Sequence, residues 1–357
     1  MRLPEHGANS KRLYASMNIT MPDEVLDFSE NCNPAGPPPS VVEAWPTLIS
    51  TLNSYPDPDG QPFRSAVSDY HQVDEQQMLV GNGAAEILSL LAGTYRGKRV
   101  LLIDPTFSEY RATLEVNGAE VVSLQAVESE GFQLPMRQIL EALPEADAIY
   151  ICTPNNPTGY LPTKDALLTI IKAANSSSTD VVLDEAFIDF VDESKSCIPQ
   201  VANYPNLLIV RSMTKMYAIP GIRLGYLIAH PERIETLKQK ASHWHVNGLA
   251  AEIGVLCLQE EAYRQQAILH AQTERLKMTQ FLRVHGCEVL DSSANYVVMK
   301  PLSDAKKLYK DLLKQGIVLR HSENFRGMDG RWLRIGMKSE PMMATLREAM
   351  DQWFKRQ

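Results

Sequence analysis

The sequence lacks long apolar runs. No stretch of its 357 residues approaches the roughly 18 consecutive apolar residues that a membrane-spanning helix requires. The first residues, MRLPEHGANSKR, are polar and lack the apolar core of a secretory signal. We therefore expect a cytoplasmic protein with no membrane partner.

Cysteine pairs and excess basic charge are also missing. The cysteines are scattered singly, without any CxxC spacing, at Cys32, Cys152, Cys197, Cys257 and Cys287. Neither a disulfide framework nor a bound metal is therefore expected. The formal net charge of −8 argues against a nucleic-acid partner and would repel an anionic substrate at long range. Any bound anion must be held by local arginines.

The chain instead shows an α/β pattern. After a strand-like segment at 78–80, short apolar runs alternate with helical stretches, which predicts a mostly parallel sheet covered on both faces. The expected strands are 99–104, 148–154, 181–187, 207–212 and 225–230. A long helical region around 231–285 follows, and then strands at 295–300, 317–321 and 332–337 with helices at 304–315 and 341–355. Because the chain is long for one core, we expect a large domain over 45–250 and a smaller α+β domain made of 1–44 plus 251–357.

The segment from Ser212 to Arg223 has the strongest chemical character. Lys215 follows a predicted strand, Ser212 and Thr214 flank it with hydroxyls, and Arg223 lies eight residues further on. An aldehyde that bears a phosphate needs this combination: an amine to form an imine, and donors for the dianion. A lone loop lysine is usually a solvated surface residue, so the prediction depends on these neighbours.

The apolar run 181–187 places Asp184 at the C-terminal end of a predicted strand, and ligands of open α/β sheets bind at that edge. A carboxylate there can keep a pyridine nitrogen protonated and the ring an electron sink, although a helix N-cap role fits equally well. The following residue, Glu185, is expected to face away.

Three further segments follow predicted strands. Gly83 and Ala84 open a helix whose free N–H groups can bind an anion, or merely form a tight connection. Asn156, between two prolines, can donate to a phenolate oxygen, and Phe107 can stack on a flat ring. Turn formation and core packing are the alternative roles of these two residues.

With SMTK…GIRLG, DEAFIDF, NNPTG and GNGAAE in this order, the chain resembles the class I/II aminotransferases of fold type I over essentially its whole length. The resemblance implies a fold-type I transferase that depends on pyridoxal 5′-phosphate (PLP). It implies that Lys215 is the Schiff-base lysine, Asp184 the partner of the pyridine nitrogen, Asn156 the donor to O3′ and Phe107 the stacking ring. The implied phosphate ligands are Ser212, Thr214, Arg223 and the backbone of Gly83 and Ala84. Tyr55 matches a tyrosine that reaches the phosphate from the other subunit, so a homodimer is implied.

Two branches of this family fit: the L-threonine-O-3-phosphate decarboxylases of cobalamin biosynthesis, and the histidinol-phosphate aminotransferases. The first is similar at HGAN (6–9), LDFSENCNPAG (26–36), FSEY (107–110) and VNGLA (246–250). It also tolerates Phe187, where the aminotransferases usually have a tyrosine. We therefore expect a lyase that converts L-threonine O-3-phosphate into (R)-1-amino-2-propanol O-phosphate, with transamination, or serine phosphate as substrate, left open.

The substrate residues are also taken from the resemblance. Arg334 matches the carboxylate-binding arginine and Arg320 the one expected to meet the substrate's phosphate; a guanidinium suits both groups bidentately. His6 and Asn9 can close over the phosphate and Asn31 can touch the carboxylate, while terminus and turn roles fit these three equally well.

Two hypotheses without catalysis remain. A PLP-sensing regulatory module would need an N-terminal DNA-binding domain, which is not expected because the N-terminal segment runs straight into catalytic-type motifs. A scaffold without cofactor is disfavoured by the presence of Lys215, Asp184 and Arg223 together.

Overall fold

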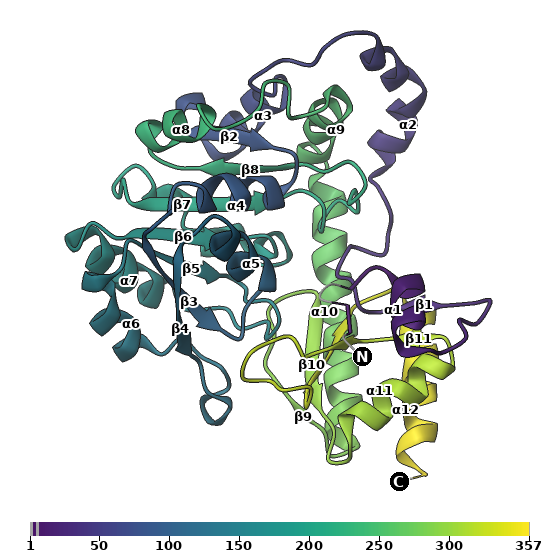
Figure 1. Cartoon of the computed structure of the whole chain (residues 1–357). Helices are drawn as coiled ribbons and strands as arrows, with labels where there is room; N and C mark the ends of the chain where they lie inside the picture. Colours follow the sequence, from purple (N-terminus) through teal and green to yellow (C-terminus); the bar gives the residue numbers. More distant parts are fainter. Residues whose placement is uncertain (1–2, 5–6, 357) are drawn as a thin grey trace.

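The computed structural model describes residues 3–4 and 7–356, and its main element is a seven-stranded sheet (Figure 1). In spatial order the strands are β2 (Met78–Gly81), β8 (Gly225–Ile228), β7 (Leu207–Ser212), β6 (Asp180–Asp184), β5 (Ala148–Cys152), β3 (Arg99–Asp104) and β4 (Glu120–Gln125). The five strands from β7 to β4 run parallel. The predicted, mostly parallel sheet is therefore confirmed.

Strand β8 runs antiparallel to both of its neighbours. It follows β7 through the loop 213–224, which contains no helix, whereas a parallel return needs a crossover connection, usually a helix. Edge strand β4 was not among the expected strands. It is half-exposed along its length, so it lacks the continuous apolar run that marks a buried strand.

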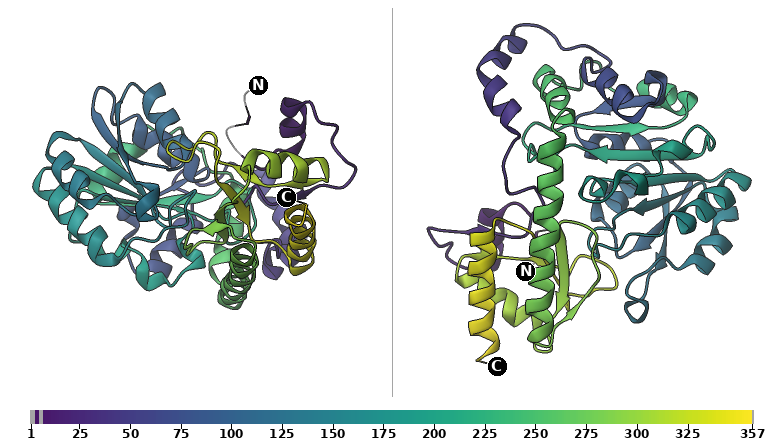
Figure 2. Two further views of the ribbon diagram at one scale, coloured as in Figure 1. Left: turned by 90° about the horizontal axis from the view of Figure 1, so that it is seen from below. Right: turned by 180° about the vertical axis from the view of Figure 1, so that it is seen from behind.

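Helices cover both faces of the sheet (Figure 2). Alternate strand residues enter two separate cores: Ile149 and Val181 pack into one, Tyr150 and Val182 into the other, as the two-residue period of a strand requires. The first face is covered by α3 (Phe63–His71), α6 (Met136–Ala142), α7 (Lys164–Ser176) and α9 (Gly248–Leu258). The second is covered by α4 (Ala84–Ala92), α5 (Ser108–Val116) and α8 (Pro231–Lys238).

A smaller α+β unit forms the other end of the molecule. Its antiparallel sheet has the order β12 (Arg320–His321), β13 (Leu333–Gly336), β10 (Tyr296–Lys300) and β9 (Glu288–Val289). Beside it, β1 (Leu26–Asp27) pairs in parallel with β11 (Ile317–Val318). The helices of this unit are α1 (Ser10–Met17), α10 (Glu261–Val284), α11 (Ala305–Lys314) and α12 (Glu340–Phe354). Figure 2 shows α10 running most of the length of the molecule, with α12 beside its lower half.

Both ends of the chain contribute to the core of this unit. Leu13, Tyr14 and Phe28 pack with residues of α10, α11 and α12. By contrast Val41 and Leu48, in α2 (Pro39–Leu48), pack into a core of the seven-stranded sheet. The domain limits 45–250 and 1–44 plus 251–357 stay a prediction.

Two features of the structure concern membrane-spanning helices and metal sites. Among the described residues, no helix combines the length and apolar character needed to cross a membrane. Within 3–4 and 7–356, no group of three or more His, Cys, Asp or Glu side chains is placed to hold a metal ion. All the cysteines are buried and unpaired.

Candidate active site

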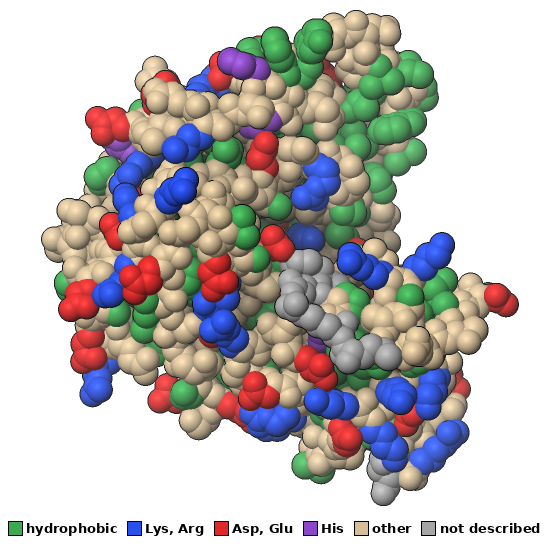
Figure 3. Space-filling model, viewed as in Figure 1, with side chains coloured by type: hydrophobic (Ala, Val, Ile, Leu, Met, Phe, Trp, Pro, Cys, Tyr) green, Lys and Arg blue, Asp and Glu red, His purple; other side chains and the backbone are tan. Residues whose placement is uncertain are grey.

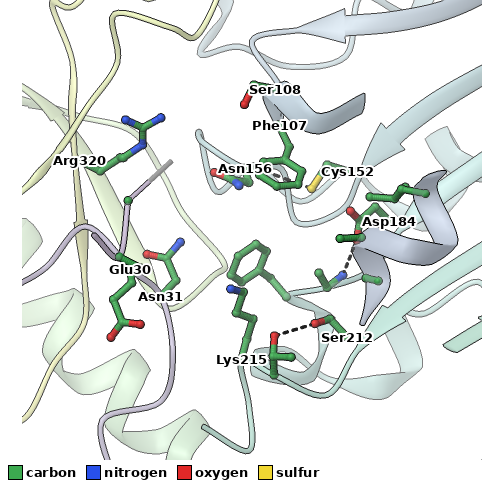
Figure 4. A pocket seen from close by; sticks show the side chains of 18 of the residues that line it. Glu30, Asn31, Phe107, Ser108, Cys152, Asn156, Asp184, Ser212, Lys215 and Arg320 are labelled. Atoms are coloured by element: carbon green, nitrogen blue, oxygen red, sulfur yellow. Dashed lines mark hydrogen bonds between the residues drawn. The ribbon is translucent and has the colours of Figure 1, made fainter. Parts of the chain in front are cut away.

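A cavity of about 310 Å³ lies between the C-terminal edge of the large sheet and the smaller unit. This volume is at the lower end of the range for small-molecule pockets. The structure brings most of the predicted residues to its walls (Figure 4), namely Asn31, Ala84, Phe107, Asn156, Asp184, Ser212, Thr214, Lys215, Arg223, Arg320 and Arg334. Residues separated by up to 303 positions in the chain therefore share one site.

One end of the cavity forms an anion cradle. Arg223 lies so close over Gly83 that a Cβ at this glycine would be 2.6 Å from the guanidinium Nη2. The hydroxyls of Ser212 and Thr214 are 2.9 Å apart. Helix α4 begins at Ala84, and the first N–H groups of a helix have no intrahelical partner. Donors from three segments therefore converge, as a phosphate requires.

Gly83 acts mainly through its conformation. Its φ is +80°, a left-handed value that glycine adopts without steric cost, and its own N–H donates to the Gly81 carbonyl at 2.7 Å. The cavity is lined by Ala84 and Ala85. The N–H groups available to an anion thus belong to α4, which includes the predicted Ala84, whereas the N–H of the predicted Gly83 is bonded within the turn.

Asp184 is buried at the end of β6. Its Oδ2 accepts a hydrogen bond from the Tyr110 hydroxyl at 2.6 Å, and its Oδ1 accepts from Ala186 N–H at 3.0 Å. Burial raises the pKa of Asp184, against the opposing effects of Tyr110, the Ala186 N–H and Lys215. A buried carboxylate whose charge is only partly stabilised is suited to pair with a protonated ring nitrogen.

Tyr110 was not predicted. It lies 74 residues from Asp184 in the chain, and the only available signal was its position one helical turn after Phe107. The alternative role of Asp184 as a cap is also present, because its bond to Ala186 N–H closes the turn after β6.

Glu185 faces the other side of the strand. It is fully buried, with its Oε2 3.1 Å from Nε of Arg211 and accepting from the Ser196 hydroxyl at 2.7 Å. Arg211 also pairs with Asp189 at 2.8 Å and with Glu193. This buried ion cluster fixes the segment after β6 against β7, next to the lysine loop.

Lys215 is partly buried in the loop 213–224 and points into the cavity (Figure 4). Asn33 fixes this loop from the other unit, since its N–H donates to the Lys215 carbonyl at 2.9 Å and its Nδ2 to the Met216 carbonyl at 3.1 Å. Asn33 was another residue that sequence reasoning missed. It is 182 positions away from Lys215, and no local pattern indicates the contact.

Arg334 lies in β13 with its guanidinium in the cavity wall. It donates to Asn156 Oδ1 at 2.5 Å and to the Ser29 carbonyl at 2.7 Å, and its Nε, although buried, has no hydrogen-bond partner among the described residues. With the amide oxygen of Asn31 turned toward it, Nη1 also lies 3.1 Å from that oxygen. The predicted carboxylate residue and the predicted O3′ donor are thus in direct contact.

Arg320 also lines the cavity and is almost fully buried. Burial, followed by the charge of Arg334, lowers its pKa to about 9, and burial lowers the pKa of Arg334 to about 10. A bound anion would offset the cost of burying the two guanidinium groups and the effect of the Arg334 charge on Arg320.

Two aromatic rings complete the walls. Phe107 lies beside Asn156 and Cys152 in the cavity (Figure 4), and its ring is edge-on to Tyr110 at 5.6 Å. Phe187 lines the cavity and contacts Tyr296 edge-on at 5.2 Å. Phe187 therefore presents no hydroxyl to whatever the cavity holds.

Two of the predicted residues that the structure describes lie elsewhere. Tyr55 is 82% exposed, and its ring is tilted against that of Trp244 with the ring centroids 5.0 Å apart, so within one chain it faces outward. Asn9 caps α1, where its side chain accepts from Arg12 N–H at 3.0 Å. It lines a small hollow beside Arg320. His6 lies outside the described residues.

The cavity fits PLP in its chemistry. A phosphate matches the cradle at Arg223 and α4, and a pyridine nitrogen matches Asp184. An aldehyde matches Lys215, and a flat ring matches Phe107. The tight approach of Arg223 to Gly83, which leaves no room for a Cβ, is what a site for a small, closely held anion requires.

Comparisons with known proteins agree with this geometry. The family model described as aminotransferase class I and II matches residues 23–352. A threonine-phosphate decarboxylase from Salmonella typhimurium is 35% identical over 97% of this chain and 96% of its own. The solved histidinol-phosphate aminotransferase of Clostridium acetobutylicum superposes with a TM-score of 0.89 at 30% identity, covering 93% of this chain and 100% of its own. The L-threonine-O-3-phosphate decarboxylase of Porphyromonas gingivalis gives a TM-score of 0.82 at 25% identity, covering 92% and 99%.

Proposed function

This chain belongs to the aminotransferase class I and II family, and on that basis we propose that it is a PLP-dependent decarboxylase of L-threonine O-3-phosphate. The product is (R)-1-amino-2-propanol O-phosphate, and the pathway is cobalamin biosynthesis, in the cytoplasm. The relatives named as threonine-phosphate decarboxylases support the reaction.

One observation carries the choice of substrate: Arg320 and Arg334, both buried, line the same cavity as Lys215. A buried guanidinium in a cavity wall is well suited to bind an anionic group of a ligand. L-Threonine O-3-phosphate has a carboxylate and a phosphate on neighbouring carbons, one for each arginine. Histidinol phosphate has a phosphate but no carboxylate, so it offers an anionic group to only one of the two arginines.

The residues of the cavity divide the work of the reaction. Arg334 and Asn31 orient the carboxylate and Arg320 the phosphate, while Asp184 keeps a proton on the ring nitrogen. Bound PLP supplies a conjugated ring that accepts the electron pair left at Cα when the bond to the carboxylate breaks. The Nζ of Lys215, in its protonated form, would donate the proton that replaces the lost carboxylate at Cα.

Histidinol-phosphate aminotransferase is the second candidate, favoured by the high structural similarity to the C. acetobutylicum enzyme. Its amino donor could occupy both arginines with two carboxylates. Phe187 favours the decarboxylase, because the aromatic ring in this wall lacks the hydroxyl that the resemblance assigns to most aminotransferases.

We further propose that the protein is a homodimer. Large apolar side chains gather over α2 and the turn after it (Figure 3), with Val42, Trp45, Ile49 and Leu52 each more than half exposed. Their spacing of three and four residues places them on one face. A contiguous exposed apolar surface of this kind marks an interface, and Tyr55 at its end is available to the phosphate cradle of a second subunit.

The test is to incubate the PLP-loaded protein with L-threonine O-3-phosphate and follow CO2 release. We expect CO2 with this substrate, and none with the Lys215→Ala variant. In parallel, histidinol phosphate with 2-oxoglutarate should give no glutamate. Absence of CO2 together with glutamate formation would establish the aminotransferase instead. A protein that binds PLP but turns over neither substrate would support a PLP-sensing module.

L-Serine O-phosphate is the matched control for specificity. It differs from the proposed substrate by one methyl group, which is worth about 1–3 kcal/mol of discrimination. We therefore expect a kcat/KM for L-serine O-phosphate about tenfold or more below that for L-threonine O-3-phosphate.

A further inference from the structure

The turn before α4 is held in shape by a carboxylate outside the cavity. Glu86, in the first turn of α4, accepts a hydrogen bond on Oε2 from the Asn82 N–H at 2.6 Å. The Glu86 N–H in turn donates to the Gly83 carbonyl at 3.1 Å. This reciprocal arrangement resembles a capping box, and it fixes the Gly81–Gly83 backbone from both sides.

A histidine from a distant loop fixes that carboxylate. His245 Nδ1 lies 2.7 Å from the same Oε2 of Glu86, and its side chain is only 9% exposed. The loop 239–247, which carries His245, joins α8 to α9. Burial raises the pKa of Glu86, but the hydrogen bonds from His245 and from Asn82 N–H outweigh it and leave this pKa below its ordinary value. Glu86 is therefore a carboxylate anchored on two sides.

The position of this turn matters because the anion cradle depends on it. Arg223 lies against Gly83 so closely that a Cβ at Gly83 would be 2.6 Å from its Nη2, and a Cβ at Gly225 would be 2.7 Å from the backbone nitrogen of Ala84. A shift of a few tenths of an ångström in the turn would change both the direction of the α4 N–H groups and the room left for Arg223.

We propose that Glu86 and His245 are positioning residues for the phosphate cradle: they do not touch the phosphate, but they hold the Gly81–Ala84 turn in the shape that binds it. This inference rests on the proposed function, because it takes the phosphate to be that of PLP. The group that these residues serve is the phosphate alone, since the ring and aldehyde are held by Asp184, Phe107 and Lys215.

Because Glu86 and His245 are proposed to serve only the phosphate, binding of PLP can be compared with binding of pyridoxal, which is PLP without the phosphate. Dissociation constants for PLP and for pyridoxal are measured by absorbance titration of the apoprotein of the wild type, Glu86→Ala and His245→Ala. We expect PLP affinity to fall about tenfold in both variants, as for loss of a hydrogen bond to a charged group, while pyridoxal affinity stays within about twofold. The conservative variant His245→Asn, which keeps an N–H donor near Nδ1, should recover most of the PLP affinity.

His243→Ala is the matched control, because His243 lies in the same loop and is exposed; its PLP affinity should equal that of the wild type. Light scattering and urea unfolding show whether each variant keeps the mass and stability of the wild type. Unchanged PLP affinity in both alanine variants would overturn the proposal, as would an equal loss of PLP and pyridoxal affinity in variants of normal stability. Failure of the wild type to bind PLP would instead overturn the proposed function.

Discussion

At the scale of single residues, burial makes the Asp184 carboxylate suited to pair with a cation. Its Oδ2 is occupied by Tyr110 and its Oδ1 by the turn after β6, so the carboxylate cannot rotate. Its pKa is raised by burial, and a cation beside it would stabilise its ionised form. The site therefore favours a protonated ring nitrogen over a neutral one.

The Asp184→Asn variant tests this role. An ion pair at about 4 Å in an environment with an effective dielectric near 20 is worth roughly 4 kcal/mol, so removing the charge should lower kcat by about 10²- to 10³-fold. The measurement is steady-state CO2 release, with the visible absorbance of the cofactor to show that it is still bound. Asp165→Asn, on the exposed start of α7, should keep the wild-type rate, and an equal rate for Asp184→Asn would contradict this role.

Arg320 and Arg334 should differ in the substrate group that they bind. In Arg320→Ala, the dissociation constant for L-threonine O-3-phosphate should rise about 10- to 100-fold, because a charge-assisted bidentate contact is lost. Binding of L-threonine, which has no phosphate, should change by less than about twofold. In Arg334→Ala both ligands should bind more weakly.

Binding is followed by the change in cofactor absorbance. Arg326→Ala, an exposed arginine near Arg320, is the control and should behave as wild type. An equal loss for both ligands in Arg320→Ala would show that this arginine does not distinguish the phosphate.

At the scale of secondary-structure elements, the sequence predicts best the features that depend on a local pattern of residues, such as the strands and the residues at their ends. The apolar runs of the parallel strands end at the same edge of the sheet, so the pattern of runs is enough to place Asp184, Asn156 and Lys215 together. Contacts across the chain could not be predicted this way. Tyr110, Asn33 and the pairing of Arg211 with Glu185 depend on packing between elements, and no periodicity within either partner indicates them.

A contact between two elements, at the end of α3, leads to a prediction about the pH dependence of stability. His71 is buried against β8, with Nε2 2.8 Å from the Tyr226 hydroxyl. Burial, and then the charge of Arg211, lower its pKa to about 2, whereas in the unfolded chain it is near 6.5. Below pH 6.5 the unfolded chain therefore binds a proton that the folded protein does not. This contribution to stability is complete above pH 6.5 and is lost by about 1.4 kcal/mol per pH unit below it.

The comparison is between the wild type and His71→Gln, by urea unfolding at pH 7.5 and pH 5.5. The free energy of unfolding of the wild type should fall between these two values by about 1.4 kcal/mol more than that of the variant. Equal changes in both proteins would mean that His71 is protonated in the folded state.

At the scale of the whole molecule, the exposed face of α2 should form the contact between subunits. A double variant, Trp45→Glu and Ile49→Glu, places two charges in this face, and burying unpaired charges costs several kcal/mol. We expect a monomer by light scattering, with weaker PLP binding because Tyr55 of a second subunit no longer reaches the cradle.

Leu276→Glu on α10 is the control, since Leu276 is also exposed, at 63%, but lies outside this face. It should keep the mass of the wild type. A wild-type protein that is itself monomeric would contradict the proposed dimer.

The segment 28–33 has a consequence for the size of substrate that the cavity accepts. Its Ser29 carbonyl is bonded to Arg334, and its Asn33 is bonded to the backbone of Lys215 and Met216. The number of residues between these two attachments therefore limits the spacing between Arg334, the proposed carboxylate ligand, and Lys215. If the proposed function holds, a longer segment here would suit a longer amino acid, so chain length at this point is a means by which the accepted substrate size can change while Arg334 and Lys215 stay the same.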